Sequence, residues 1–144
     1  MPRTCALPRR HDSDTTTANR GDTNAYSRSM SLIAIEASIT LNDASVRDAA
    51  VAESARFQKA TRDEEPGCLV YCFAADPCAP DHIQVYELWA DETSLAAHFD
   101  HPNYHNMRDM LGRYGLKSAV SRKLRIDKTA PVYGPDFKAS ASFD

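Results

Sequence analysis

The sequence lacks the short motifs and long apolar runs that identify several common protein classes. Its five glycines never stand at the spacing of a G-x-G-x-x-G or P-loop phosphate site, so nothing supports nucleotide or flavin binding through such loops. It has no G-x-S-x-G nucleophile elbow and no Ser-His-Asp arrangement. No apolar run approaches the roughly 20 residues of a membrane span, and the N-terminus has no apolar core of a secretory signal. We therefore expect neither a hydrolase of these types nor a membrane protein.

Cysteine is scarce and forms no paired motif. The four cysteines contain no C-x-x-C sequence. Cys68 and Cys72 stand on one expected strand, roughly 13 Å apart at the usual rise per residue, which is too far for a disulfide bond. We expect free thiols and a cytoplasmic protein, because disulfides are rare in that compartment. A Cys68–Cys78 bridge across a hairpin is the alternative.

Positive charge is scarce in the body of the chain. The formal net charge is −3. Residues 31–127 carry ten Lys or Arg against fifteen Asp or Glu, whereas residues 1–30 carry five Arg against three Asp. Because binding to phosphate backbones needs a basic surface, nucleic acid is not an expected partner.

Three segments of different composition divide the chain. Residues 1–29 are rich in Arg, Asp, Thr and Ser and have almost no apolar periodicity, so we expect a disordered extension. Two interpretations of this extension stay open: Met30 is the true start, or the extension is a targeting segment. Residues 30–127 form the patterned domain, and residues 128–144 are a tail with three aromatic residues and no clear element.

The patterned domain predicts four strands and two helical regions. Alternating apolar residues indicate the strands, and apolar residues at helical spacing indicate the helices. The expected elements are strands at 31–41, 68–74, 82–90 and 119–126, a helix at 44–63, a short helix capped by Asp91, and a helical segment from Pro102 to Tyr114. The expected apolar face of the first helix consists of Val46, Ala49, Ala50, Phe57 and Ala60.

The order β-α-β-β-α-β is typical of the ferredoxin-like fold. In this α+β architecture, helices cover one face of a four-stranded antiparallel sheet. The opposite face must also be hidden from water if it is apolar. In a domain of this size the obvious cover is a second copy, so we expect a homodimer.

The third strand carries the first candidate site residues. Because side chains alternate along a strand, Glu87 and Trp89 point to the same face. Burying a carboxylate on an apolar strand costs free energy unless the carboxylate is paired with a cation or solvated. Glu87 is therefore a candidate ligand-binding residue, with an ion pair to a neighbouring arginine as the alternative. Trp89, the only tryptophan, is a core residue or the edge of a pocket where its indole N–H finds a partner.

His98 is the second candidate, because it lies in register with Leu95 among apolar neighbours. It is either a satisfied core histidine or a general base that titrates near neutral pH. His101 and His105 continue the spacing, but Pro102 interrupts the helix and no further ligand joins them. We therefore expect no metal site.

Further candidates stand nearby. Arg108 is positioned to hold an anionic oxygen, with a surface ion pair as the alternative. The aromatic residues are expected either to wall a ligand pocket or simply to pack, and they are Tyr71, Phe99 and Tyr104.

Several of these residues carry a resemblance to a known family. The segments are Glu65-Pro66-Gly67-Cys68 with Tyr71, Glu87-x-Trp89, and Leu95-x-x-His98 followed by Pro102. Their order and spacing resemble the antibiotic biosynthesis monooxygenase (ABM) domain, and the small quinol monooxygenases in particular. The resemblance covers residues 31–127. It implies a ferredoxin-like dimer whose two sheets form an α+β barrel, with a pocket between helices and sheet that is lined at the Trp89 and His98 positions.

The resemblance implies an enzyme that oxidises a quinol or a similar electron-rich aromatic substrate with O2 as co-substrate and without a cofactor. In this hypothesis His98 accepts a proton, and Trp89 or Arg108 stabilises the oxyanion. The expected substrate-binding residues are Tyr71, Glu87, Phe99, Tyr104 and His105.

Two departures from relatives narrow the hypothesis. The positions of the Asn, Trp and His used by haem-degrading relatives hold Glu36, His98 and Arg108 here, so haem cleavage is not expected. Anthrone-oxidising relatives carry a Tyr about where Leu95 stands. A small-molecule isomerase on the same fold and a non-catalytic dimeric ligand-binding module are the alternative functions.

Overall fold

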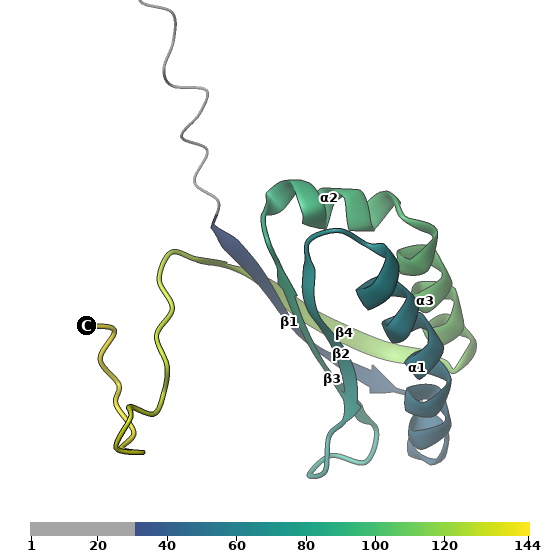
Figure 1. Ribbon diagram of the computed structural model, residues 1–144. Helices are drawn as coiled ribbons and strands as arrows, with labels where there is room; N and C mark the ends of the chain where they lie inside the picture. Colours follow the sequence, from purple (N-terminus) through teal and green to yellow (C-terminus); the bar gives the residue numbers. More distant parts are fainter. Residues whose placement is uncertain (1–30) are drawn as a thin grey trace, which may run out of the picture.

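The computed structural model describes residues 31–144, so the predicted N-terminal extension at 1–29 lies outside the described residues. One sheet has the strand order β2-β3-β1-β4, all neighbours are antiparallel, and the helices lie on one face of it (Figure 1). The elements are β1 (Leu32–Leu41), a 3-10 turn (Ala44–Val46), α1 (Arg47–Glu64), β2 (Cys68–Ala75), β3 (His82–Trp89), α2 (Glu92–Asp100), α3 (Pro102–Arg113) and β4 (Leu116–Ile126). This arrangement confirms the predicted ferredoxin-like α+β fold. The last strand begins at Leu116 rather than at the predicted Ala119.

Local signals in the sequence place the ends of the helices. The Asp43 side chain accepts a hydrogen bond from the Ser45 amide at 2.8 Å, and Asp91 caps α2 through the Ser94 amide at 2.7 Å. Pro102 occupies the first turn of α3, where its missing N–H costs nothing. Gly67 turns the chain into β2 with a φ of +85°, and a Cβ there would stand 2.2 Å from the Ser94 hydroxyl oxygen.

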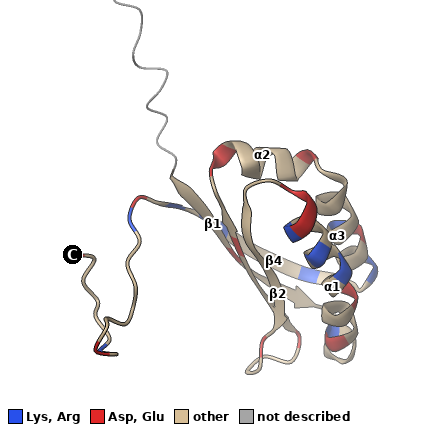
Figure 2. Cartoon of the chain, in the orientation of Figure 1, with Lys and Arg blue, Asp and Glu red and all other residues tan. Residues whose placement is uncertain are grey.

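The core lies between the sheet and the helices. Alternate residues of β3 point into it, so Ile83, Val85, Glu87 and Trp89 share the inner face as predicted. Charged residues are frequent on the helices (Figure 2). Among the strands, β2 carries none, β1 and β3 carry one each, and β4 carries four basic residues. No helix within residues 31–144 combines the length and apolarity needed to cross a bilayer.

The inner face of α1 is partly apolar and partly polar. Val46, Ala50 and Phe57 pack against the core as expected, but buried polar residues join them. The buried residues are Ala50, Ser54, Gln58 and Thr61, whereas Ala49 is exposed. The Gln58 amide donates to the Phe73 carbonyl oxygen at 3.0 Å and accepts from the Phe73 amide at 3.2 Å. Hydrogen bonding to the free edge of β2 therefore makes these polar residues compatible with burial.

The face of the sheet opposite the helices, called the outer face below, carries three cross-strand rows that span all four strands, and the third of them consists of Ala74, Gln84, Ser38 and Val120. The first row is apolar and consists of Val70, Leu88, Ala34 and Leu124. The second consists of Cys72, Tyr86, Glu36 and Arg122. Within it, Arg122 and Glu36 form an ion pair at 2.6 Å.

Candidate active site

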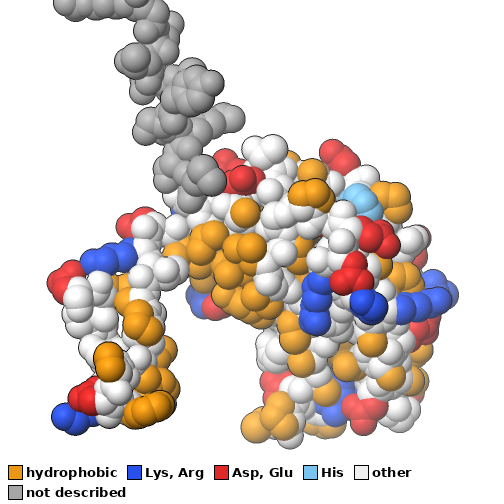
Figure 3. Space-filling view, in the orientation of Figure 1, with side chains coloured by type: hydrophobic (Ala, Val, Ile, Leu, Met, Phe, Trp, Pro, Cys, Tyr) orange, Lys and Arg blue, Asp and Glu red, His pale blue; other side chains and the backbone are white. Residues whose placement is uncertain are grey.

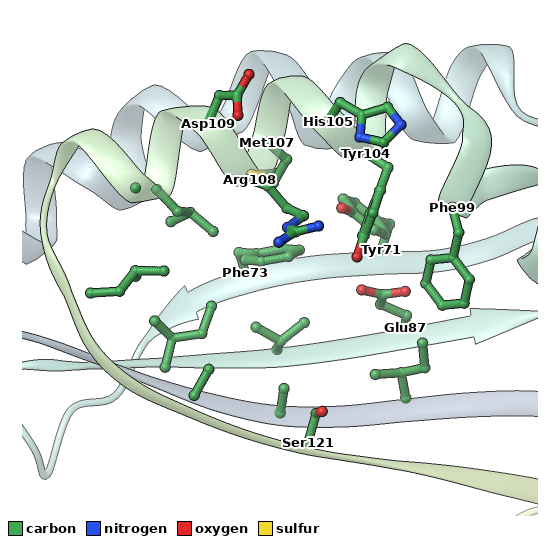
Figure 4. A pocket seen from close by; sticks show the side chains of 18 of the residues that line it. Tyr71, Phe73, Glu87, Phe99, Tyr104, His105, Met107, Arg108, Asp109 and Ser121 are labelled. Atoms are coloured by element: carbon green, nitrogen blue, oxygen red, sulfur yellow. The ribbon is translucent and has the colours of Figure 1, made fainter.

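A cavity of about 930 Å³ lies between α3 and the inner face of the sheet and opens beside β4. This volume is in the range of small-molecule sites. Figure 4 shows side chains from the strands forming its floor and side chains of α3 reaching down from above. The apolar lining comes mainly from Ile35, Ile39, Phe73, Val85, Met107 and Leu111.

Glu87 is the only acidic side chain that the sheet contributes to this lining. It is 7% exposed, and its Oε2 accepts a hydrogen bond from the Trp89 indole N–H at 3.0 Å. Burial raises the pKa of Glu87 to about 7; the indole hydrogen bond opposes this change and the negative charge of Glu65 adds to it. Among the described residues no arginine pairs with Glu87, so the ion-pair alternative is wrong.

Arg108 extends from α3 into the cavity (Figure 4). Its guanidinium carbon lies 5.4 Å from the centroid of the Tyr104 ring, within the range of a cation–π contact. No carboxylate in residues 31–144 forms an ion pair with it, whereas the neighbouring Arg113 pairs with Glu53. Arg108 is exposed, as the alternative of a surface residue predicted, but the ion pair predicted with it is absent from residues 31–144. Asp109 is also a lining residue of the cavity, and its side chain points upward from α3 in Figure 4.

Aromatic side chains line the cavity near Glu87. The Tyr104 and Phe99 rings lie 5.2 Å apart in an edge-to-face arrangement, and the Tyr104 hydroxyl points toward Glu87 (Figure 4). Tyr71 also lines the cavity, and burial raises its pKa, with the negative charges of Glu87 and Glu65 adding to the effect. His105 lies beside Tyr104 with ring centroids 5.4 Å apart. All five predicted substrate-binding residues therefore meet in one cavity.

Trp89 and His98 lie behind this wall and do not line the cavity. Their ring centroids are 4.6 Å apart, and both side chains are fully buried. The prediction that the two rings lie close together is confirmed, but the sequence did not show that both are fully buried. The predicted direct action of the pair on a substrate stays a prediction, and the geometry favours Glu87 as the residue in contact with a ligand.

Glu65 is the partner of His98 that the sequence did not predict. His98 Nδ1 lies 2.6 Å from Glu65 Oε2, and His101 Nδ1 lies 3.4 Å from Oε1. Burial lowers the pKa of His98, while the hydrogen bond and charge of Glu65 oppose that change. A carboxylate beside the negative end of a helix is unfavourable unless it has a partner. The position of Glu65 just after α1 could therefore have predicted a hydrogen-bonding partner for its carboxylate.

The side chains of His98, His101 and His105 do not meet at one point. His98 and His101 approach Glu65, whereas His105 lines the cavity. No group of three His, Cys, Asp or Glu within residues 31–144 is arranged to hold a metal ion.

Comparison with known proteins bears on the family and the fold. The family model described as antibiotic biosynthesis monooxygenase matches residues 33–110, more than half of the chain. No curated protein matches significantly.

Solved structures share the fold. A protein of Caulobacter crescentus, assigned provisionally to the antibiotic biosynthesis monooxygenases, is 19% identical with a TM-score of 0.60, over 66% of this chain and 89% of its own. A similarly assigned protein of Deinococcus radiodurans is 18% identical with a TM-score of 0.59, over 71% of this chain and 99% of its own. A protein of Bacteroides thetaiotaomicron, described provisionally as an oxidoreductase, is 18% identical with a TM-score of 0.59, over 67% and 99%. At these identities the likeness shows the fold alone.

Proposed function

This chain belongs to the antibiotic biosynthesis monooxygenase family, and on that premise we propose that it is a cofactor-independent monooxygenase. Its substrate would be a quinol or a similar electron-rich aromatic molecule, and O2 would be the co-substrate. The observation that carries the proposal is that Glu87, the carboxylate that the sheet contributes, shares one cavity with Arg108, which has no ion-pair partner among the described residues.

The charges in the cavity suit a phenol that must lose its proton. An unperturbed phenol has a pKa of about 10, and the Glu87 carboxyl has a pKa of about 7. Transfer between these groups is uphill by about 4 kcal/mol. Arg108 supplies a positive charge that stabilises the phenolate. A carboxyl that titrates near neutral pH both accepts and returns a proton efficiently.

The overall chemistry then balances without a further reductant. The deprotonated ring donates electrons to O2, and a peroxide forms on a ring carbon. The O–O bond breaks, Glu87 returns its proton to the departing oxygen, and water leaves. One oxygen atom stays on the ring and the other becomes water, so a quinol is converted to a hydroxyquinone with the four electrons supplied by the substrate.

Trp89 and His98 act as positioning residues in this proposal. The Trp89 indole holds one oxygen of Glu87 at 3.0 Å, and the His98 ring packs against the indole. Glu65 fixes His98 from the other side at 2.6 Å. Aromatic rings of Tyr71, Phe99 and Tyr104 would contact the substrate ring.

We also propose that the protein is a homodimer that buries its outer face. The apolar row Val70, Leu88, Ala34 and Leu124 crosses all four strands. The charged residues of the adjacent row, Glu36 and Arg122, already neutralise each other, so burial would leave no unpaired charge there. The same face on a second copy is the self-complementary partner that a two-fold dimer requires.

The direct test is O2 consumption. Purified protein, checked to be colourless and free of metal, is given a panel of quinols and anthrones, with Glu87→Gln as the matched variant. Rapid uptake that Glu87→Gln reduces at least ~100-fold is expected. Absence of uptake across the panel would reject the oxygenase, and equal uptake by the variant would reject the role of Glu87.

A further inference from the structure

The tail at residues 128–144, called the C-terminal arm below, hangs away from the body of the protein. It follows β4 and lies on the side of the sheet opposite the helices (Figure 1). Its aromatic side chains are exposed, at 61% for Tyr133, 87% for Phe137 and 56% for Phe143. Figure 3 shows apolar side chains on the arm and on the neighbouring surface of the body, with open space between them.

The arm has a defined conformation although it is separate from the body. Tyr133 pairs with Ala139, the Ser140 amide donates to the Val132 carbonyl oxygen at 2.9 Å, and Lys128 pairs with Asp144 at 2.9 Å. Within residues 31–144, every hydrogen bond of the arm joins two residues of the arm. An isolated two-stranded hairpin is at best marginally stable in water, so this one needs a surface to pack against.

The backbone at the tip supports the same conclusion. Phe137 has a φ of 56°, in the left-handed region that is unfavourable for a bulky residue. Such a conformation persists only when surrounding contacts over-determine it. The side chain of Phe137 has few contacts within residues 31–144, because it is 87% exposed.

The area of the arm suits a subunit interface. At ~200 Å² for each aromatic side chain, the exposed fractions of Tyr133, Phe137 and Phe143 correspond to roughly 400 Å² per arm. Two arms in a symmetric dimer would supply roughly 800 Å², about half of a standard interface of about 1,600 Å². The outer face would supply the rest.

We infer that the C-terminal arm packs against a second copy of this chain and places Tyr133, Phe137 and Phe143 at the outer face of the partner. The inference rests on the proposed dimer and adds the arm as the element that stabilises it. A second copy fits because the open space lies between the arm and its own outer face (Figure 3). The matched family region ends at residue 110, so the arm is a feature of this chain beyond that region.

The first experiment measures the dimer. Tyr133, Phe137 and Phe143 are all replaced with Ser in the full chain, and sedimentation over a dilution series gives the dissociation constant. Loss of three aromatic contacts should raise it at least ~100-fold. Lys138→Ser changes an exposed residue of the same arm and should leave it within about twofold. An unchanged constant in the triple variant would overturn the inference. Circular dichroism checks that the variant is folded.

The second experiment locates the arm without weakening it. A photo-reactive benzoylphenylalanine replaces Phe137, and illuminated protein is run on a denaturing gel. Contact with the partner gives a covalent dimer, and its cross-linked peptides should come from the outer face. Cross-links that leave only the 16.0 kDa chain would show an arm folded onto its own subunit and overturn the inference. A wild-type monomer at every concentration would overturn both the arm contact and the dimer, while O2 uptake would still decide the oxygenase separately.

Discussion

Replacing Glu87 with Gln should stabilise the protein above neutral pH while it removes activity. Burial raises the pKa of Glu87 from its ordinary value of 4.5 to about 7, so the folded protein holds this proton more tightly than the unfolded chain does. A group with a raised folded-state pKa contributes its full stability below pH 4.5 and loses it as the pH rises to 7. The interval between the two values corresponds to about 3 kcal/mol.

The glutamine introduced by this change cannot ionise, and its amide oxygen can still accept the hydrogen bond that the Trp89 indole donates to Glu87 at 3.0 Å. The free energy of unfolding of the variant should therefore exceed that of the wild type by up to about 3 kcal/mol above pH 7. The difference should shrink toward zero near pH 4. Urea unfolding followed by the fluorescence of the single tryptophan measures it at each pH. Asp127→Asn, at an exposed position just after β4, is the control and should change the free energy of unfolding by less than about 0.5 kcal/mol at each pH.

Activity provides the second half of this test. The carboxylate form of Glu87 must accept the substrate proton, so kcat/KM of the wild type should rise with pH and level off above about 7. Glu87→Gln should lose at least ~100-fold of this rate and show no such rise. A variant that is less stable than the wild type at every pH would refute the burial argument. A variant with full activity would refute the role in proton transfer.

Three other changes test separate parts of the structure. Arg108→Ala should lower kcat/KM for O2 uptake by ~10- to 100-fold through loss of oxyanion stabilisation. The control Arg113→Ala removes an exposed ion pair and should change kcat/KM less than about twofold. Equal effects of the two changes would contradict the role of Arg108 in stabilising the oxyanion. Gly67→Ala should lower the free energy of unfolding by at least ~1 kcal/mol because of its positive φ and the clash with a neighbouring hydroxyl, and Gly112→Ala, with nothing within 4 Å, should raise it by up to ~1 kcal/mol. His98→Ala should lower the free energy of unfolding in urea by about 3 kcal/mol. It should also displace the acid limb of the pH profile of kcat/KM, because the Trp89 indole that holds Glu87 loses the ring packed behind it. An unchanged acid limb would show that His98 has only a packing role.

Much of the fold was predictable because it follows from short-range patterns. Alternation along β3 places Glu87 and Trp89 on one face, and this depends only on the two-residue period of a strand. Capping by Asp91 and the turn at Gly67 are equally local. The element order then left few arrangements, since helices and strands in this order favour one packing.

Depth and partners were less predictable because they depend on residues far apart in the sequence. Periodicity correctly pointed His98 inward, but its hydrogen-bond partner Glu65 lies 33 residues earlier in the sequence. Gln58 was not among the residues expected on the inner face of α1, and its burial depends on the backbone of Phe73, fifteen residues later. A hydrophobicity pattern does not register hydrogen bonds of that kind.

The bonds from α1 to β2 bear on how this protein could aggregate. Gln58 pairs with both backbone groups of Phe73, and Arg62 donates to the Tyr71 carbonyl oxygen at 2.8 Å. An uncovered border strand is a template on which further chains can stack into fibrils. At β2 the side chains of a helix already occupy that template, so fibril growth would have to start from β4 at the opposite border.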